Sequence, residues 1–409
     1  MQRLRTLVMI PLVLLALTLA LAACGPDPEG SPTTASAAPA TTPTTPEATP
    51  EPMPTQTAAP TAQPTAEPTP TQTATPTAPA TPTATAEPTP TQDAMTLPPE
   101  VTQAFANVRG IVDPTNFSWP REVEGLNGVF SIPFKPLRII TASVGHDEMT
   151  LALVPLDRLV AVGSASQNAT YSNVADLLQD KPQISRDPET IIAEAPDVVV
   201  TSPFFSADGV EALSKAGVLV IQTELKHDAE ARINNILLMG YIFGEEERAV
   251  EFATEIRDRY ESLIAVTGAV ETRPRVLALT QYSDKLWVAG ADSTEGSVIE
   301  AAGGLNAAAD AGVEGNQTTS LEGVIAMAPE VIVIAQPREF GAEEFRQSLF
   351  DNEALAELPA IKNEAVHIVE GKHFTTLSYW NIRGAEDLAR LLWPEDFGDT
   401  ESPPFSLAE

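Results

Sequence analysis

The stretches ETIIAEAPDVVV (residues 189–200) and EGVIAMAPEVIV (residues 322–333) align without a gap, and seven of their twelve positions are identical. In each copy a helical pattern ends at a proline, Pro196 or Pro329. An acidic residue and a β-branched run follow, which predicts a buried strand. A helix, a proline and a strand can occur in this order by convergence, but the matching glutamate at the head of both copies favours a repeated lobe.

Other short runs rich in Val, Ile and Leu predict further strands, and helical patterns separate them. Such strands indicate parallel sheets that helices cover on both faces. We expect strands near residues 138–142, 158–162, 197–201, 218–222, 275–280, 331–335 and 365–369.

Between the two halves, residues 244–270 show a helical pattern that no turn signal interrupts. Apolar residues recur at the spacing of one helix face, at Ala249, Phe252, Ala253, Ile256 and Tyr260. We therefore predict one helix of about twenty residues, roughly 30 Å long, that joins the lobes and permits only a small opening motion.

The first residues predict secretion. Arg3 and Arg5 precede an apolar run and the sequence Leu21-Ala22-Ala23-Cys24, as in a secretory signal peptide over residues 1–23. The last four residues resemble a bacterial lipobox, so we expect a lipid on Cys24. An unlipidated signal with a chance cysteine is the alternative. Cys24 is the single cysteine of the chain, which excludes an intramolecular disulfide.

Residues 24–99 are dominated by Thr, Pro, Ala and Glu, and we expect a disordered, extended linker that holds a folded domain away from a membrane. The net charge of the whole chain is −32. A surface this acidic argues against nucleic acid or anionic lipid as a partner.

Gly145-His146-Asp147-Glu148 follows the first predicted strand, where open α/β sheets bind ligands. We expect a loop in which Asp147 caps the next helix and Glu148 complements the helix dipole, in preference to ligand contact. His146 could touch a ligand or a metal. One histidine and two adjacent carboxylates lack the spread of ligands that a zinc site needs, and the four histidines form no HExxH pair.

Several segments together resemble the substrate-binding lipoproteins of ABC importers for iron complexes and cobalamin. They are residues 138–162, the two repeated stretches, RPRVLAL (273–279), LWVAG (286–290), GSVIEAAGGLNA (296–307) and LPAIKNEAVHIVEG (358–371). The resemblance implies an α/β fold with two Rossmann-like lobes, residues 100–243 and 271–409, joined by one long helix over 244–270. The ligand would bind between the lobes.

The resemblance also implies a function. The protein would be a monomer anchored outside the cell membrane that captures a ferric siderophore or related iron chelate and delivers it to a permease dimer. Heme and cobalamin are the alternative ligands. No cofactor is expected. No catalysis is expected either, because there is no GxSxG and no evident pair of nucleophile and base. An extracellular hydrolase on the same scaffold is a further alternative.

Aromatic residues make up 6% of the chain yet gather in the loops after the predicted strands, which favours a pocket for a large, flat or apolar ligand. Cations near them would bind ligand carboxylates. The expected ligand-binding residues are His146, Tyr171, Phe204, Phe205, Tyr282, Trp287, Arg338, Tyr379, Trp380 and Arg383. The resemblance implies that Tyr171 would ligate iron if the ligand is heme. It also implies that Glu189 and Glu322 pair with permease arginines, where the alternative is that each simply begins a helix.

Overall fold

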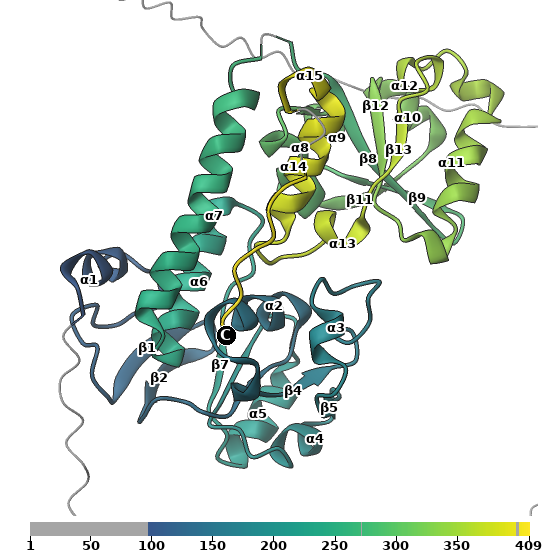
Figure 1. Ribbon diagram of the computed structural model, residues 1–409. Helices are drawn as coiled ribbons and strands as arrows, with labels where there is room; N and C mark the ends of the chain where they lie inside the picture. The colour runs from purple at the N-terminus through teal and green to yellow at the C-terminus, as the bar shows by residue number, and fades with distance from the viewer. Residues whose placement is uncertain (1–96, 271, 398–400) are drawn as a thin grey trace, which may run out of the picture. The chain divides into compact units, whose positions relative to one another are not determined.

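The computed structural model describes residues 97–270, 272–397 and 401–409. The expected signal peptide, Cys24 and nearly all of the expected linker lie outside these residues. Within them, no helix is both long and apolar enough to span a bilayer. The described chain forms two lobes, each built on its own sheet (Figure 1).

The first lobe contains a parallel sheet in the order β5-β4-β3-β6-β7. Its strands are β3 (Ile139–Thr141), β4 (Leu159–Gly163), β5 (Gln183–Ile184), β6 (Val198–Thr201) and β7 (Val220–Gln222). The helical segments between and after them are α2 (Val144–Leu153), η1 (Leu156–Arg158), α3 (Ala175–Leu178), α4 (Pro188–Ile192), α5 (Ala207–Lys215) and α6 (Ala229–Phe243). The four strands expected in this half are confirmed; β5 is too short to produce a pattern.

Helices cover both faces of this sheet, which explains the unbroken apolar runs. Val198 and Val200 of β6 point toward α2 and α6. Val199, between them, packs on the opposite face with Ile191 of α4 and Leu213 of α5. Because neighbouring side chains of a strand point to opposite faces, a strand covered on both sides needs apolar residues at every position.

The sheet of the second lobe follows the order β11-β9-β8-β12-β13, with β10 beside β8. Its elements are β8 (Arg275–Tyr282), β9 (Lys285–Ala289), α8 (Thr294–Ala301), β10 (Leu305–Asn306), α9 (Ala307–Asp310), β11 (Asn316–Thr319), α10 (Leu321–Met327), β12 (Val331–Ile334), η2 (Arg338–Phe340), α11 (Ala342–Phe350), η3 (Glu353–Leu355), α12 (Pro359–Lys362), β13 (Val366–Ile368), α13 (Gly371–Phe374), α14 (Asn381–Leu392) and α15 (Pro394–Phe397).

The expectation of an all-parallel second sheet needs correction. The three strands expected here are parallel, but β9 runs antiparallel to β8 and β11 runs antiparallel to β9. The reversal occurs because β8 and β9 form a hairpin with two residues, Ser283 and Asp284, between its paired ends. Ser283 has a positive φ of 57°, the conformation that such tight hairpin turns require.

The repeated stretches form the same junction in both lobes. Helix α4 and strand β6 correspond to α10 and β12, and Ala195 and Ala328 occupy equivalent positions with φ of 45° and 44°. In the first lobe, Asp197 accepts the backbone N–H of Arg138 at 2.8 Å, and the guanidinium of Arg138 donates to the carbonyls of Glu194 and Ala195, just after α4.

The second lobe repeats these contacts. Glu330 accepts the backbone N–H of Arg275 at 2.8 Å, and Arg275 donates to the carbonyl of Met327 at 2.8 Å. A common helix–proline–strand signal would not by itself reproduce an arginine and an acid that join the same two elements. The contacts support an internal repeat.

Helix α7 (Glu246–Thr267) connects the lobes, as predicted (Figure 1). Its apolar face, which includes Phe252, Ile256 and Leu263, belongs to a hydrophobic core that continues into helices of both lobes. At about 1.5 Å per residue, its 22 residues span roughly 33 Å. Because it is packed along its length, α7 links the lobes as a rigid element.

A helix and a hairpin precede the first lobe: α1 (Pro99–Phe105), β1 (Arg121–Gly125) and β2 (Gly128–Ile132). Arg121 is buried, and its guanidinium donates to the carboxylate of Glu246 at the start of α7 and to the carbonyl of Tyr241 at 2.6 Å. No expectation from the sequence covered this hairpin, although the turn between Gly125 and Gly128 is a typical signal.

Candidate ligand cleft

A hollow of about 640 Å³ lies at the carboxyl ends of the strands of the first lobe. The segments that follow β3, β4, β5 and β6 all contribute to its walls. Open α/β sheets bind ligands at this edge. Hydroxyl groups are frequent in the lining, which includes Ser143, Ser164, Ser166, Ser185, Ser202 and Ser206.

Two aromatic side chains stand beside these hydroxyls. Phe204 is 80% exposed, and Phe205 is half-buried against the first-lobe sheet. Both lie in the loop after β6, at the predicted sheet edge. An exposed ring of this size offers an apolar face to a partner that the folded chain itself does not supply.

Arg186 is the cation of the hollow, and the sequence reasoning missed it. It is exposed and lines the wall that follows β5. Its side chain makes no hydrogen bond or ion pair with the other described residues. Arg338, which the sequence analysis did propose, instead pairs with Glu343 on the second lobe.

The lining residues of this hollow all belong to the first lobe, and the second lobe carries aromatic residues of its own. Trp287 lies directly opposite Thr280 in the β8–β9 hairpin, so Trp287 and Tyr282 share one face of that sheet. Tyr282 is 53% exposed. Burial first, and then the nearby Glu295 carboxylate and Tyr171 phenol, raise the pKa of Tyr282.

Several side-chain contacts join the lobes here. The rings of Tyr171 and Phe340 lie 6.3 Å apart, and both remain nearly half exposed. His227 Nδ1 and Thr294 Oγ1 are 2.9 Å apart. Lys372 donates to the carbonyl of Ala169 at 3.2 Å, beside a smaller pocket of about 240 Å³ that both lobes line.

Glu148 forms a buried polar link between the lobes. Its carboxylate accepts the backbone N–H of Asn173 at 2.8 Å from the first lobe. It also accepts the hydroxyl of Thr376 at 2.9 Å and that of Ser378 from the second. Burial raises the pKa of Glu148, which these hydrogen bonds partly oppose.

The expectation that Gly145 to Glu148 forms a loop is wrong, because these residues lie inside α2. Ser143 is the N-cap, so Asp147 does not cap the helix. The carboxylate of Asp147 instead accepts the hydroxyls of Thr141 and Ser166. Burial raises the pKa of Asp147 well above its ordinary value.

His146 is a structural residue of the first lobe. It is fully buried, with Nδ1 2.7 Å from Ser143 Oγ and Nε2 2.7 Å from Thr223 Oγ1. Burial lowers the pKa of His146 to about 3, so the ring is neutral. Both ring nitrogens are occupied, which corrects the expectation of a ligand or metal contact.

Comparison with known proteins agrees with this architecture. A family model described as periplasmic binding protein matches residues 139–371, more than half of the chain. The chain belongs to the periplasmic binding protein family. The matched segment runs from β3 to the start of α13 and therefore includes both sheets and α7.

Individual relatives of this family are distant. A Bacillus subtilis protein described as an uncharacterized ABC transporter substrate-binding lipoprotein, YvrC, is 23% identical over 65% of this chain and 83% of its own length. The ferric enterobactin-binding periplasmic protein FepB of Escherichia coli is 20% identical over 69% and 94%. The apo structure of the heme-binding protein RhuT from Roseiflexus sp. RS-1 shares the fold at 22% identity, with a TM-score of 0.55, over 63% of this chain and 98% of that one.

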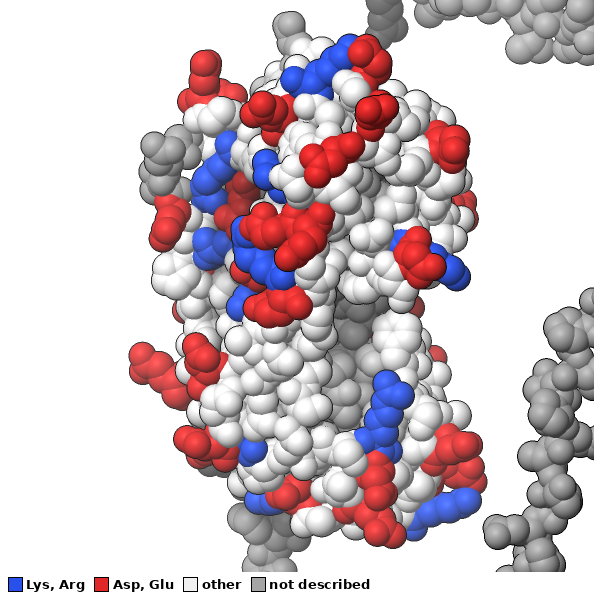
Figure 2. Space-filling view, turned by 90° about the vertical axis from the view of Figure 1, so that its right-hand side faces the viewer, with Lys and Arg blue, Asp and Glu red and all other residues white. Residues whose placement is uncertain are grey.

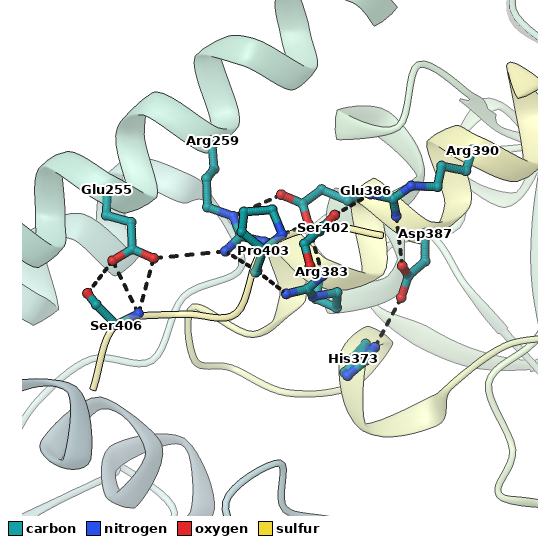
Figure 3. Close-up of polar contacts among 10 residues, drawn as sticks. All are labelled: Glu255, Arg259, His373, Arg383, Glu386, Asp387, Arg390, Ser402, Pro403 and Ser406. Carbon is teal, nitrogen blue, oxygen red and sulfur yellow. Dashed lines mark hydrogen bonds and ion pairs between the residues drawn. The ribbon is translucent and has the colours of Figure 1, made fainter. Parts of the chain in front are cut away.

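Three residues expected at the cleft lie instead around a C-terminal strap, residues 401–409. Tyr379 is fully buried, which corrects the expectation of ligand contact. Trp380 stacks on His373 at 5.7 Å and meets the ring of Phe405 edge-on. Arg383 donates to the carbonyl of Ser402 at 2.7 Å, so its cation holds the strap and not a ligand (Figure 3).

The strap also reaches the connecting helix and the first lobe. Arg259 of α7 donates to the carbonyl of Pro403 at 3.2 Å, and Glu255 accepts the hydroxyl of Ser406 (Figure 3). The backbone N–H of Ala408 then donates to the carbonyl of Leu151 in α2 at 3.0 Å. Nothing in the pattern of the sequence indicated these long-range contacts.

Glu189 and Glu322 occupy equivalent positions in the first turns of α4 and α10. Both are exposed, and neither makes an ion pair within the described residues. Acidic side chains are spread over both lobes on the face seen in Figure 2. The described residues contain no group of three or more His, Cys, Asp and Glu placed to hold a metal ion.

Proposed function

We propose that this protein captures a metal chelate between its lobes and delivers it to the permease of an ABC importer. A ferric siderophore or related iron chelate is the preferred ligand, and heme and cobalamin are the alternatives. The protein acts as a binding protein without catalysis and works outside the cytoplasm, held by a lipid on Cys24. Cys24 lies outside the described residues, so the anchor rests on the sequence alone.

The hollow at the carboxyl edge of the first lobe is the observation that carries the proposal. It combines serine hydroxyls, the exposed ring of Phe204 and the cation of Arg186, which has no ion-pair partner in the part of the chain that the structure describes. Tyr282 and Trp287 on the second lobe add aromatic surface. Such walls suit a bulky ligand with an apolar surface and at least one anionic group.

The names of relatives agree with this class of ligand. FepB is named for ferric enterobactin, and a Halobacterium salinarum relative, 25% identical over 52% of this chain and 57% of its own length, is named a cobalamin-binding protein. YvrC is named as a substrate-binding lipoprotein of an ABC transporter. At these identities the names support the class of ligand and do not choose between its members.

The rigid connection between the lobes favours a ligand that already has its bound shape in solution. Helix α7, the strap and the hydrogen bonds of Glu148 all connect the two lobes. The lobes can then move toward each other only slightly, so they cannot close around a small flexible molecule. Affinity must instead come from shape complementarity to a bulky chelate. If the ligand is heme, Tyr171 at the cleft supplies the phenol oxygen that would ligate its iron.

Mass spectrometry of what co-purifies with the protein, together with its absorption spectrum, tests the proposal. A chelate should be released on denaturation, and a bound heme or corrin should give a visible spectrum that Tyr171→Phe alters only in the case of heme. A released peptide or sugar without metal would contradict the proposal.

A further inference from the structure

Glu295 is a buried carboxylate of the second lobe, next to a contact with the first. It lies in the first turn of α8 and is 8% exposed. Asn316 Nδ2 is its side-chain partner, at the long distance of 3.5 Å, and Glu295 makes no ion pair within the described residues. Burying a carboxylate costs free energy unless hydrogen-bond donors or cations compensate for the lost water.

Glu295 lies close to the place where the second lobe contacts the first. Its neighbour Thr294 contacts His227 of the first lobe at 2.9 Å, so this end of α8 faces the other lobe. Tyr282, at the end of β8, lies close enough for the charge of Glu295 to raise its pKa. The carboxylate thus lies near Tyr282, on the side of the second lobe that contacts the first.

The two walls of the cleft differ in charge. The first lobe offers Arg186, an exposed cation with no partner among the described residues. The second lobe offers Glu295, a carboxylate that accepts its own backbone N–H and, at 3.5 Å, the side-chain amide of Asn316. A ligand that places an anionic group at the first wall and an N–H donor at the second would satisfy both.

We infer, on the basis of the proposed function, that Glu295 is a specificity-determining residue that accepts a hydrogen bond from a protonated amine or an amide N–H at the edge of the bound chelate. Where the same ligand also carries an anionic group, Arg186 receives it. The cleft therefore favours chelates with nitrogen-bound hydrogens over chelates whose edge carries carboxylates alone. A ligand carboxylate brought against the buried carboxylate of Glu295 would be repelled, which disfavours the second class.

Four probes separate these classes. Ferrioxamine B ends in a protonated amine, and its N-succinyl derivative has the same ferric core but ends in a carboxylate. Cyanocobalamin has an amide periphery, and hemin has a carboxylate periphery. Dissociation constants are measured by calorimetry for the wild-type protein, for Glu295→Gln and for Glu300→Gln, which changes an exposed glutamate of the same helix.

The wild type and Glu300→Gln should bind ferrioxamine B or cyanocobalamin at least about tenfold more tightly than the carboxylate probes, the scale of one charge-assisted hydrogen bond. Glu295→Gln should reduce that preference about tenfold. A purely structural role of Glu295 would change the melting temperature but leave the preference intact.

The inference is overturned if hemin or the succinylated chelate binds the wild type as tightly as the donor-bearing probes, or if Glu295→Gln and Glu300→Gln show the same preference. Either result would leave the proposed function standing, because a chelate would still be bound. Binding of none of the four probes would count against the proposed function and, with it, against this inference.

Discussion

At the scale of single residues, the N-terminal half of α2 places three ionisable side chains in succession, and all are fully buried. His146, Asp147 and Glu148 each find hydrogen-bond partners, so their polar atoms are satisfied although water is excluded. Burial disfavours the charged form of each group, lowering the pKa of the histidine and raising the pKa of both carboxyls.

His146 should make folding stability depend on pH. Its pKa falls from 6.5 in the unfolded chain to about 3 in the folded one. The unfolded state therefore binds more protons, and the stability present above pH 6.5 is lost as pH falls toward 3. Between pH 7 and pH 5 this group alone should remove about 2 kcal/mol.

The variant His146→Gln keeps groups that can bond Ser143 and Thr223 but does not titrate. Urea unfolding of both proteins at pH 7 and pH 5 should therefore show a fall that is about 2 kcal/mol larger in the wild type. Equal falls in the two proteins would refute this account of His146. Comparison with the variant matters because Asp147 and Glu148, whose pKa values are raised, act in the opposite direction.

The residues of the cleft could be predicted from the sequence only in part. Phe204 and Tyr282 follow predicted strands and lie at the cleft, because strand ends specify a sheet edge. Tyr379 and Arg383 also follow a strand, but the strap covers them. Arg186 follows a two-residue strand without a periodic pattern, so its position at the hollow could not be anticipated.

At the scale of elements, the junctions before β6 and β12 contain strain that a test can expose. Ala195 and Ala328 adopt positive φ, which costs an L-residue about 1–2 kcal/mol, whereas glycine loses only about 0.5–1 kcal/mol of entropy there. Ala195→Gly and Ala328→Gly should each raise the free energy of unfolding by roughly 0.5–1 kcal/mol.

Ala193→Gly is the matched control, because Ala193 has a φ of −60° at the end of α4. It should lower the free energy of unfolding, since glycine there adds entropy to the unfolded chain without relieving strain. Chemical denaturation measures all three variants. Destabilisation by all three would show that the positive φ carries no strain.

The strap is the second element with a measurable role. Phe405 is 7% exposed, its ring lies 4.8 Å from those of Tyr379 and Trp380, and the guanidinium of Arg259 lies 4.0 Å from its centre. Phe405→Ala should lower the free energy of unfolding by about 3 kcal/mol. Phe204→Ala, at an 80% exposed ring, should cost little. Equal effects in thermal or urea unfolding would contradict the role of the strap.

Most elements could be predicted because their patterns are local. The strands expected from apolar runs are present, and α7 follows from its uninterrupted helical period. The short strands β5 and β10, and the antiparallel direction of β9 and β11, depend on pairing between segments, which a single run of residues does not record.

At the scale of the whole molecule, two similar lobes place Glu189 and Glu322 at equivalent positions on exposed helix starts. If they dock a permease, Glu189→Arg with Glu322→Arg should abolish uptake of the ligand in cells while its affinity for the purified protein stays unchanged. Glu211→Arg with Glu343→Arg, at exposed positions of the two lobes, is the control and should leave uptake intact. Normal uptake with the first pair would leave these glutamates only a helix-start role.

The central claim is that the cleft binds a metal chelate, and titration of the purified protein tests it most directly. Hemin, cyanocobalamin and ferric siderophores are added in turn while tryptophan fluorescence and melting temperature are recorded. One class should quench fluorescence to saturation at one ligand per protein and raise the melting temperature. Arg186→Ala should weaken that binding about tenfold, whereas Arg109→Ala, at an exposed cation outside the hollow, should not. If no chelate causes quenching or a melting shift, the protein does not bind this class of ligand.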